Sequence, residues 1–134
     1  RHLSADWLLQ EKDKSKTLFV KLSLKYSFAI SVITKLEILA GITESQRDFW
    51  NSVFQKTLII PLEEHEVEIA ATILQDLKKR NQIIGIKDIL IGSTCLSKGL
   101  KFATLNRKDF ERIAGLELID EWLSIKKQFV TWCF

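Results

Sequence analysis

Three acidic side chains stand where a carboxylate is unusual. Glu37 lies inside the apolar segment ISVITKLEILAG, Asp88 lies inside IIGIKDILIG, and Asp109 lies in ATLNRKDF. Ordinary explanations exist for each one. Glu37 could point outward from an amphipathic helix, and Asp88 could cap the helix that follows it. Asn106 with Asp109 matches a pattern that satisfies the first-turn amides of a helix.

Taken together, the three acids favour a shared site. Each one follows or flanks a predicted strand, and sites in open parallel sheets form outside the carboxyl ends of the strands. Carboxylates held close together repel one another and need a cation to stay ionised. Oxygen ligands suit Mg²⁺ or Mn²⁺ rather than zinc, and a bound Mg²⁺ can activate water beside a phosphodiester. The predicted chemistry is metal-assisted hydrolysis of nucleic acid.

The elements that must position these residues alternate along the chain. Short apolar runs predict buried parallel strands, and apolar residues at helical spacing predict helices between them. This alternation predicts an α/β/α sandwich with a short, mainly parallel central sheet flanked by helices. Strands are expected at 28–32, 57–62, 100–105 and 116–119, and helices at 3–11, 17–26, 35–40, 44–56, 63–80, 87–98, 106–113 and in a tail over 120–134.

The details of these helices can also be predicted. Thr34 is expected to cap the helix over 35–40, while Gly41 and Gly99 are expected to end helices. The inward faces of the two longest periodic segments are expected to carry Phe49, Trp50, Val53 and Phe54 in the first and Val67, Ala70, Ala71, Leu74 and Leu77 in the second.

Composition limits the class of protein. The chain has 134 residues, 46% of them apolar, so it suits a single domain over 1–134 with one core. No apolar run approaches the roughly 18 residues of a membrane span. Cys95 and Cys133 lie far apart, which predicts reduced thiols and a cytoplasmic location. The net charge of +3 and the lysine clusters are compatible with RNA and equally with an ordinary solvated surface. His2 and His65 lack zinc spacing.

With these motifs the sequence resembles the PIN-domain nucleases, and among them the VapC-type ribonuclease toxins of toxin–antitoxin modules. The matching stretches are ISVITKLEILAG (30–41), IKDILIGSTCLSKGLKFATLNRKDFERIAGL (86–116) and, more loosely, IIPLEEHEVEIAATIL (59–74). The first two occur in the family's order and at its spacing, and neither alone would be specific.

The resemblance implies a site and an activity. Glu37 matches the family's second acid, Asp88 its third, and either Asn106 or Asp109 its fourth position. Thr34 and Thr104 match hydroxyl positions beside the site, where they and Asn106 would contact substrate. The implied function is a Mg²⁺- or Mn²⁺-dependent endoribonuclease toxin that cuts RNA, binds a cognate antitoxin and forms a homodimer.

The two ends of the chain depart from the family pattern. The family's first acid lies on a central N-terminal strand, whereas Asp6 lies in the predicted helix that would follow this strand. With no methionine in the sequence, this predicts that a strand is missing upstream, which would cost the metal a ligand and leave sheet edges open. A catalytically inactive binding module is therefore the alternative function. The aromatic tail is expected either to cover the sheet or to contact a dimer partner or antitoxin, through Trp122, Phe129, Trp132 and Phe134.

Overall fold

The computed structural model describes residues 27–104, 106–119 and 131–133. The predicted helices over 3–11 and 17–26, the tail over 120–130 and Asp6 lie outside these residues. The described elements follow one another as β1 (Ser27–Ser31), α3 (Val32–Gly41), the 3₁₀ turn η1 (Glu44–Gln46), α4 (Arg47–Lys56), β2 (Leu58–Ile60), α5 (Glu64–Lys79), α6 (Ile86–Lys98), β3 (Lys101–Phe102), α7 (Arg107–Phe110) and β4 (Thr131–Cys133).

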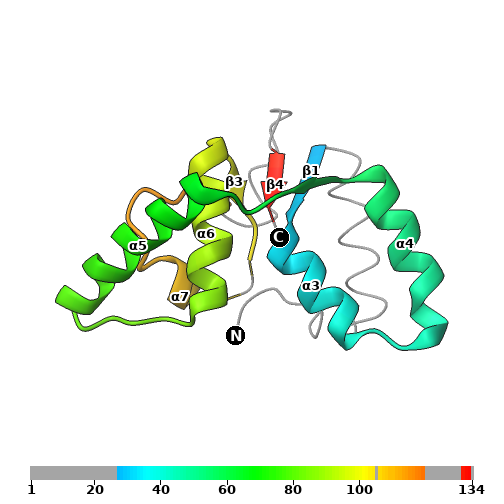
Figure 1. Cartoon of the computed structure of the whole chain (residues 1–134), viewed down its shortest axis with the longest axis horizontal. Helices are drawn as coiled ribbons and strands as arrows, with labels where there is room; N and C mark the ends of the chain where they lie inside the picture. Colours follow the sequence, from blue (N-terminus) through cyan, green and yellow to red (C-terminus); the bar gives the residue numbers. More distant parts are fainter. Residues whose placement is uncertain (1–26, 105, 120–130, 134) are drawn as a thin grey trace.

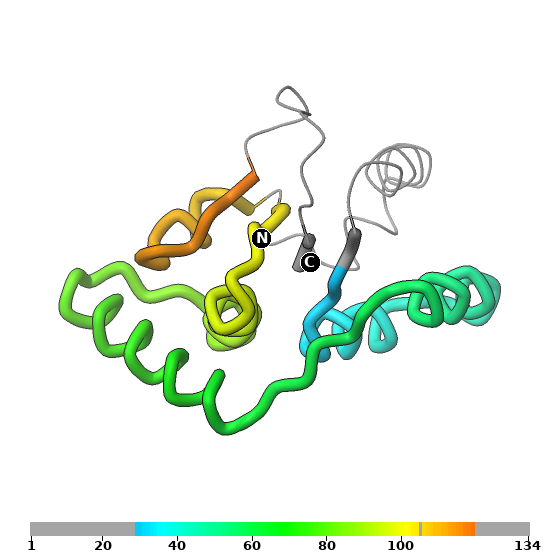
Figure 2. The backbone as a smooth tube through the Cα atoms, turned by 90° about the horizontal axis from the view of Figure 1, so that it is seen from above, coloured from blue at the N-terminus to red at the C-terminus, as the bar shows by residue number. Residues whose placement is uncertain are grey.

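The strands form one parallel sheet in the order β2-β1-β4-β3. In Figure 1, α3 and α4 lie on the β1 side of the strands, and α5, α6 and α7 lie on the β3 side. Figure 2 shows the chain crossing from the α4 side to the α5 side through β2 and the loop after it. The predicted class, a short parallel sheet flanked by helices, is confirmed.

The centre of the sheet differs from the prediction. β4 pairs with β1 on one side, where Phe28 lies opposite Trp132, and with β3 on the other, where Phe102 lies opposite Cys133. The prediction of a helix is therefore wrong for 131–133, which are extended because both neighbouring strands offer backbone partners. Open sheet edges are expected where a missing strand would pair; in this structure β4 pairs with the facing edges of β1 and β3.

The last predicted strand, 116–119, is reduced to a single bridge. Leu118 forms an isolated parallel bridge with Phe102, supported by hydrogen bonds from Phe102 N to Glu117 O (2.8 Å) and from Ile119 N to Phe102 O (2.9 Å). β3 is equally short, with two residues. These few backbone bonds place 116–119 beside β3 without a further strand.

The main core lies between α5, α6, β3 and α7. The rings of Phe102 and Phe110 pack at 4.4 Å between centroids, and Cys95 is a buried thiol in the same cluster, as expected of a reduced cysteine. The α5 residues that enter this core are Ala70, Ile73 and Leu77. Burying these apolar side chains is what fixes α6 against α5.

Some predicted inward positions are wrong. Trp50 and Val53 of α4 are buried, but Phe49 is exposed; on α5, Val67 and Ala71 are exposed. The buried residues of α5 are Glu66, Ala70, Ile73 and Leu77, so the first position of the buried face is a charged residue. The prediction uses apolar residues alone and so places Val67 in the core. The structure buries Glu66 instead.

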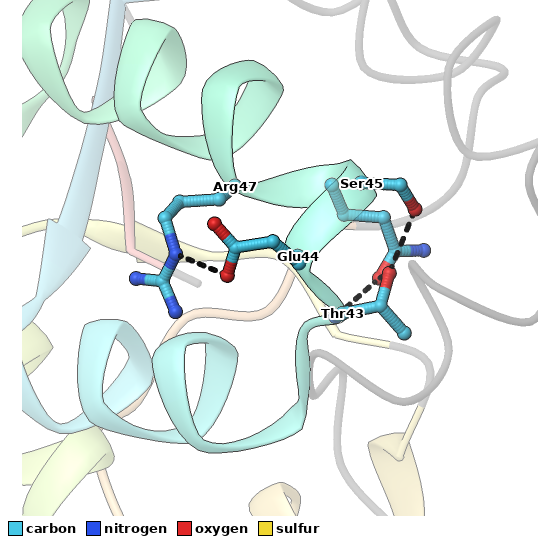
Figure 3. A network of polar contacts seen from close by, with 5 residues as sticks. Thr43, Glu44, Ser45 and Arg47 are labelled. Atoms are coloured by element: carbon cyan, nitrogen blue, oxygen red, sulfur yellow. Dashed lines mark hydrogen bonds and ion pairs between the residues drawn. The ribbon is translucent and has the colours of Figure 1, made fainter.

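Polar contacts close the link between α3 and α4 (Figure 3). Gln46 Oε1 accepts a hydrogen bond from Thr43 N at 3.0 Å, and the Thr43 and Ser45 hydroxyls lie 3.0 Å apart. Glu44 pairs with Arg47 at 3.3 Å. The bond from Thr43 N satisfies a backbone amide at the start of η1, the turn that leads into α4.

Candidate functional site

The start of α3 fixes the first acidic position. Ser31 ends β1 and caps α3: its Oγ accepts a hydrogen bond from Thr34 N at 3.0 Å and donates one to Thr34 Oγ1 at 3.1 Å. The cap is thus Ser31 and not, as predicted, Thr34, because Ser31 keeps the extended backbone that a cap requires. Thr34 is buried in the first turn of α3, the helix that carries Glu37 one turn further on.

Glu37 does not point into solvent. Its side chain is only 10% exposed, although it lies between the exposed residues Leu36 and Leu39 on α3. The explanation of Glu37 as an outward residue of an amphipathic helix is therefore wrong. A carboxylate that is this far removed from water needs a cation or hydrogen-bond donors to remain ionised.

Asp88 lies in the first turn of α6 and is 5% exposed. The N-cap of this helix is Gly85, so Asp88 is not the cap. A negative charge in the first turn is favoured by the helix dipole, which gives Asp88 a place here without a cap role. The other end of α6 is as predicted: Gly99 adopts a left-handed backbone with φ 64° and ends the helix.

An ion pair connects the two acidic positions. Lys87 Nζ lies 3.4 Å from Glu37 Oε2, and Lys87 is the residue directly before Asp88. The pair lies between the first turn of α6 and the middle of α3, two helices that are in contact. Sequence reasoning missed Lys87; its signal was a lysine directly before an acid in an otherwise apolar run.

The donor set suits a hard cation. Glu37 Oε1 and Asp88 Oδ1 are buried atoms that accept no hydrogen bond from the described residues, while both side chains keep other interactions. Within 27–104, 106–119 and 131–133, no three His, Cys, Asp or Glu side chains come close enough to hold one metal ion. Mg²⁺ is commonly held by one or two carboxylates with water and substrate phosphate, so a two-carboxylate set is compatible with it.

Asn106 and Asp109 form a second polar group, at the end of the β3 segment. Asn106 Nδ2 donates to Asp109 Oδ2 at 3.0 Å, and Asn106 N donates to Thr104 Oγ1 at 3.0 Å. Asn106 is the N-cap residue of α7, but its side chain makes no cap hydrogen bond. The amide instead orients the Asp109 carboxylate, and α7 packs against α6, the helix that carries Asp88.

Comparisons with known proteins match most of the chain to one family and to named relatives. The PIN domain family matches residues 6–116. The chain is 37% identical over 101 residues to "Ribonuclease VapC1" of Rickettsia felis, covering 67% of the chain and 73% of that relative. It is 33% identical over 96 residues to "Ribonuclease VapC1" of Methanocaldococcus jannaschii, covering 69% of the chain and 71% of that relative.

A solved structure shares the fold. The crystal structure of VapBC2 from Rickettsia felis bound to a DNA fragment from their promoter contains a chain that matches with a TM-score of 0.72 and 22% identity. The match covers 88% of this chain and 96% of that chain.

None of the helices in the described part of the chain is both long and apolar enough to cross a membrane.

Proposed function

Because the chain belongs to the PIN-domain family, we propose that it is a Mg²⁺- or Mn²⁺-dependent endoribonuclease toxin of a type II toxin–antitoxin system. The observation that carries this proposal is the packing of α3 against α6, which sets the nearly buried Glu37 beside the turn that carries Asp88. Relatives that are called ribonuclease VapC, at 33–37% identity, support the same activity.

In this proposal, different parts of the fold position each acidic side chain. Glu37 and Asp88 would hold the cation from facing helices. Asp109 and Asn106 would serve as further oxygen ligands only after moving closer, because no three such acidic side chains in the described residues lie within reach of one metal ion. When bound, Mg²⁺ supplies an activated water and stabilises negative charge on the phosphodiester. The chain's own contribution is to keep these oxygens in place, through the Ser31 cap on α3 and the Asn106 amide on Asp109.

The proposal also assigns RNA contacts. Thr104 and Asn106 lie next to Asp109 and are joined by the bond from Asn106 N to Thr104 Oγ1. Hydroxyl and amide groups of this kind can bond to phosphate and 2′-hydroxyl groups. Thr34 is included on the family pattern; its hydroxyl already accepts a bond from Ser31, so a substrate contact there would require this bond to rearrange.

The proposed partners are RNA as substrate, a cognate antitoxin protein and a second copy of the chain. The fold shared with the VapBC2 structure supports an antitoxin partner. A cytoplasmic location is part of the proposal, because RNA and an antitoxin encoded nearby are met there. The sequence provides positive charge for an RNA partner, with a net charge of +3.

The direct test is RNA cleavage with Mg²⁺, with Mn²⁺ and with EDTA. Asp88→Asn and Glu37→Gln are each expected to lower the cleavage rate by about 100-fold or more, as removal of a group that stabilises transition-state charge does. Glu117→Gln, which removes an exposed carboxylate, is the matched control and is expected to cleave at the wild-type rate. Circular dichroism checks that each variant folds. Full activity of both site variants would refute the assignment.

A binding or regulatory module with the same fold is the second candidate. The ion pair with Lys87 favours it, because this pair allows Glu37 to be neutralised without a metal ion. Such a module would bind RNA or an antitoxin and leave RNA intact with either metal. Metal-dependent turnover that is lost in Asp88→Asn would exclude it.

A further inference from the structure

Lys87 has an arrangement that a simple surface ion pair does not require. Its side chain is 58% exposed, yet its ammonium reaches Glu37, whose side chain is 10% exposed. Asp88, the next residue, is buried. A positive charge on a flexible stem therefore extends from solvent to the edge of the site that holds both carboxylates.

This geometry suits a replaceable counter-ion. Nearby carboxylates raise each other's electrostatic energy, and an opposite charge within about 4–6 Å relieves it. A lysine ammonium is a strongly hydrated point charge on a rotatable chain, so it can return to water at little cost. Its exposed side also keeps the pair weak compared with a buried one. Lys87 can thus neutralise Glu37 and still give way to a stronger cation.

We propose that Lys87 is a built-in counter-ion that competes with a divalent metal ion for Glu37, so that the chain's metal affinity is set below the value that its carboxylates alone would give. The inference rests on the proposed metal site and adds a regulation of it. Its physical consequence is that removing the ammonium strengthens metal binding and weakens the metal-free fold.

The test is titration of the full chain with MnCl₂ by calorimetry, together with thermal unfolding in EDTA and in Mn²⁺. Lys87→Met removes the charge and keeps an apolar stem, whereas Lys87→Arg keeps the charge. Lys79→Met removes a positive charge from the exposed last turn of α5 and controls for net charge. We expect Lys87→Met to lower the Mn²⁺ dissociation constant about tenfold, by analogy with the effect of one nearby charge on a carboxyl group.

The other variants define the outcome. Lys79→Met and Lys87→Arg are expected to bind Mn²⁺ with nearly wild-type affinity. Lys87→Met should also unfold at a lower temperature than Lys79→Met in EDTA and gain more from added Mn²⁺. If the wild-type chain binds Mn²⁺, Glu37→Gln abolishes this binding, and Lys87→Met binds no more tightly than Lys79→Met, the competition is refuted while the metal site stands. Failure of every variant and of the wild type to bind Mn²⁺ overturns the metal site and the competition together.

Discussion

Replacing Ser97 by alanine tests how α6 is held in place. Glu66 of α5 is 2% exposed, and its two carboxylate oxygens accept hydrogen bonds from Glu63 N at 3.1 Å and from Ser97 Oγ at 2.9 Å. The Ser97 bond is the one that reaches across from α6. A hydrogen bond to a charged group contributes about 1.5–3 kcal/mol, and alanine recovers about 0.5 kcal/mol of helix propensity. We expect Ser97→Ala to lower the free energy of unfolding by about 1–2.5 kcal/mol.

The loss should depend on pH. The pKa of Glu66 is lowered chiefly by the Ser97 hydrogen bond; burial opposes this, and the Glu63 backbone bond and the nearby charges of Lys98 and His65 assist it. A carboxyl group with a lowered pKa in the folded chain stabilises the fold above its unfolded pKa of about 4.3. This contribution disappears as the pH falls through the folded pKa. The difference between wild type and Ser97→Ala is therefore expected to shrink below about pH 4.

Urea unfolding at pH 7 and at decreasing pH measures both effects. Thr72→Ala is the matched control, because among the described residues the Thr72 hydroxyl on α5 bonds to the carbonyl of Glu68 in its own helix. This control should change stability by less than about 0.5 kcal/mol. A loss in Ser97→Ala no larger than in Thr72→Ala, or a loss that is equal at pH 7 and pH 3.5, would show that the Glu66 contact does not join the two helices.

Two further predictions concern the ends of secondary structure. Gly99→Ala should cost about 1–2 kcal/mol, since φ is 64° there, whereas Gly85→Ala, at φ −62° with open space around it, should be nearly neutral; equal unfolding midpoints would contradict this. Removal of residues 131–134 should lower the thermal midpoint and increase self-association, because β1 and β3 lose the strand between them. A truncated chain with the wild-type midpoint, measured by calorimetry and light scattering, would show that β4 adds nothing to the sheet.

Much of the fold was predictable because its signals are local. The apolar run before Val32 and the periodic segments around Leu77 and Ile91 produce β1, α5 and α6 nearly where they were expected. Gly99 ends α6 because a left-handed residue strongly favours glycine. Glu37 and Asp88 could be singled out because each is an acid within an apolar run, but their burial could not be inferred from the residues directly before them, Leu36 and Lys87, which are exposed.

The parts that could not be predicted depend on contacts between distant segments. β4 is extended because it pairs with β1 on one side and β3 on the other. The residue types within 131–133 do not predict this pairing. Glu66 of α5 is buried and accepts a hydrogen bond from Ser97, 31 positions later in the chain. The role of Lys87 depends on Glu37, 50 positions away. A pattern within one segment carries no information about such pairs.

The two nearly buried glutamates, Glu66 and Glu37, show that burial of a carboxylate does not by itself indicate a metal site. Both carboxylate oxygens of Glu66 accept hydrogen bonds from donors that are fixed by the fold. One donor is the backbone amide of Glu63 at the start of the same helix, and the other is the Ser97 hydroxyl on the packed helix α6. Glu37 has other interactions too, but one of its partners is an ammonium on an exposed, flexible stem, next to the turn that carries Asp88. Fixed donors stabilise a carboxylate without offering a partner that a metal ion could replace. A movable ammonium, by contrast, can be replaced by another cation. This difference supports a structural role for Glu66 and places the proposed chemistry at Glu37.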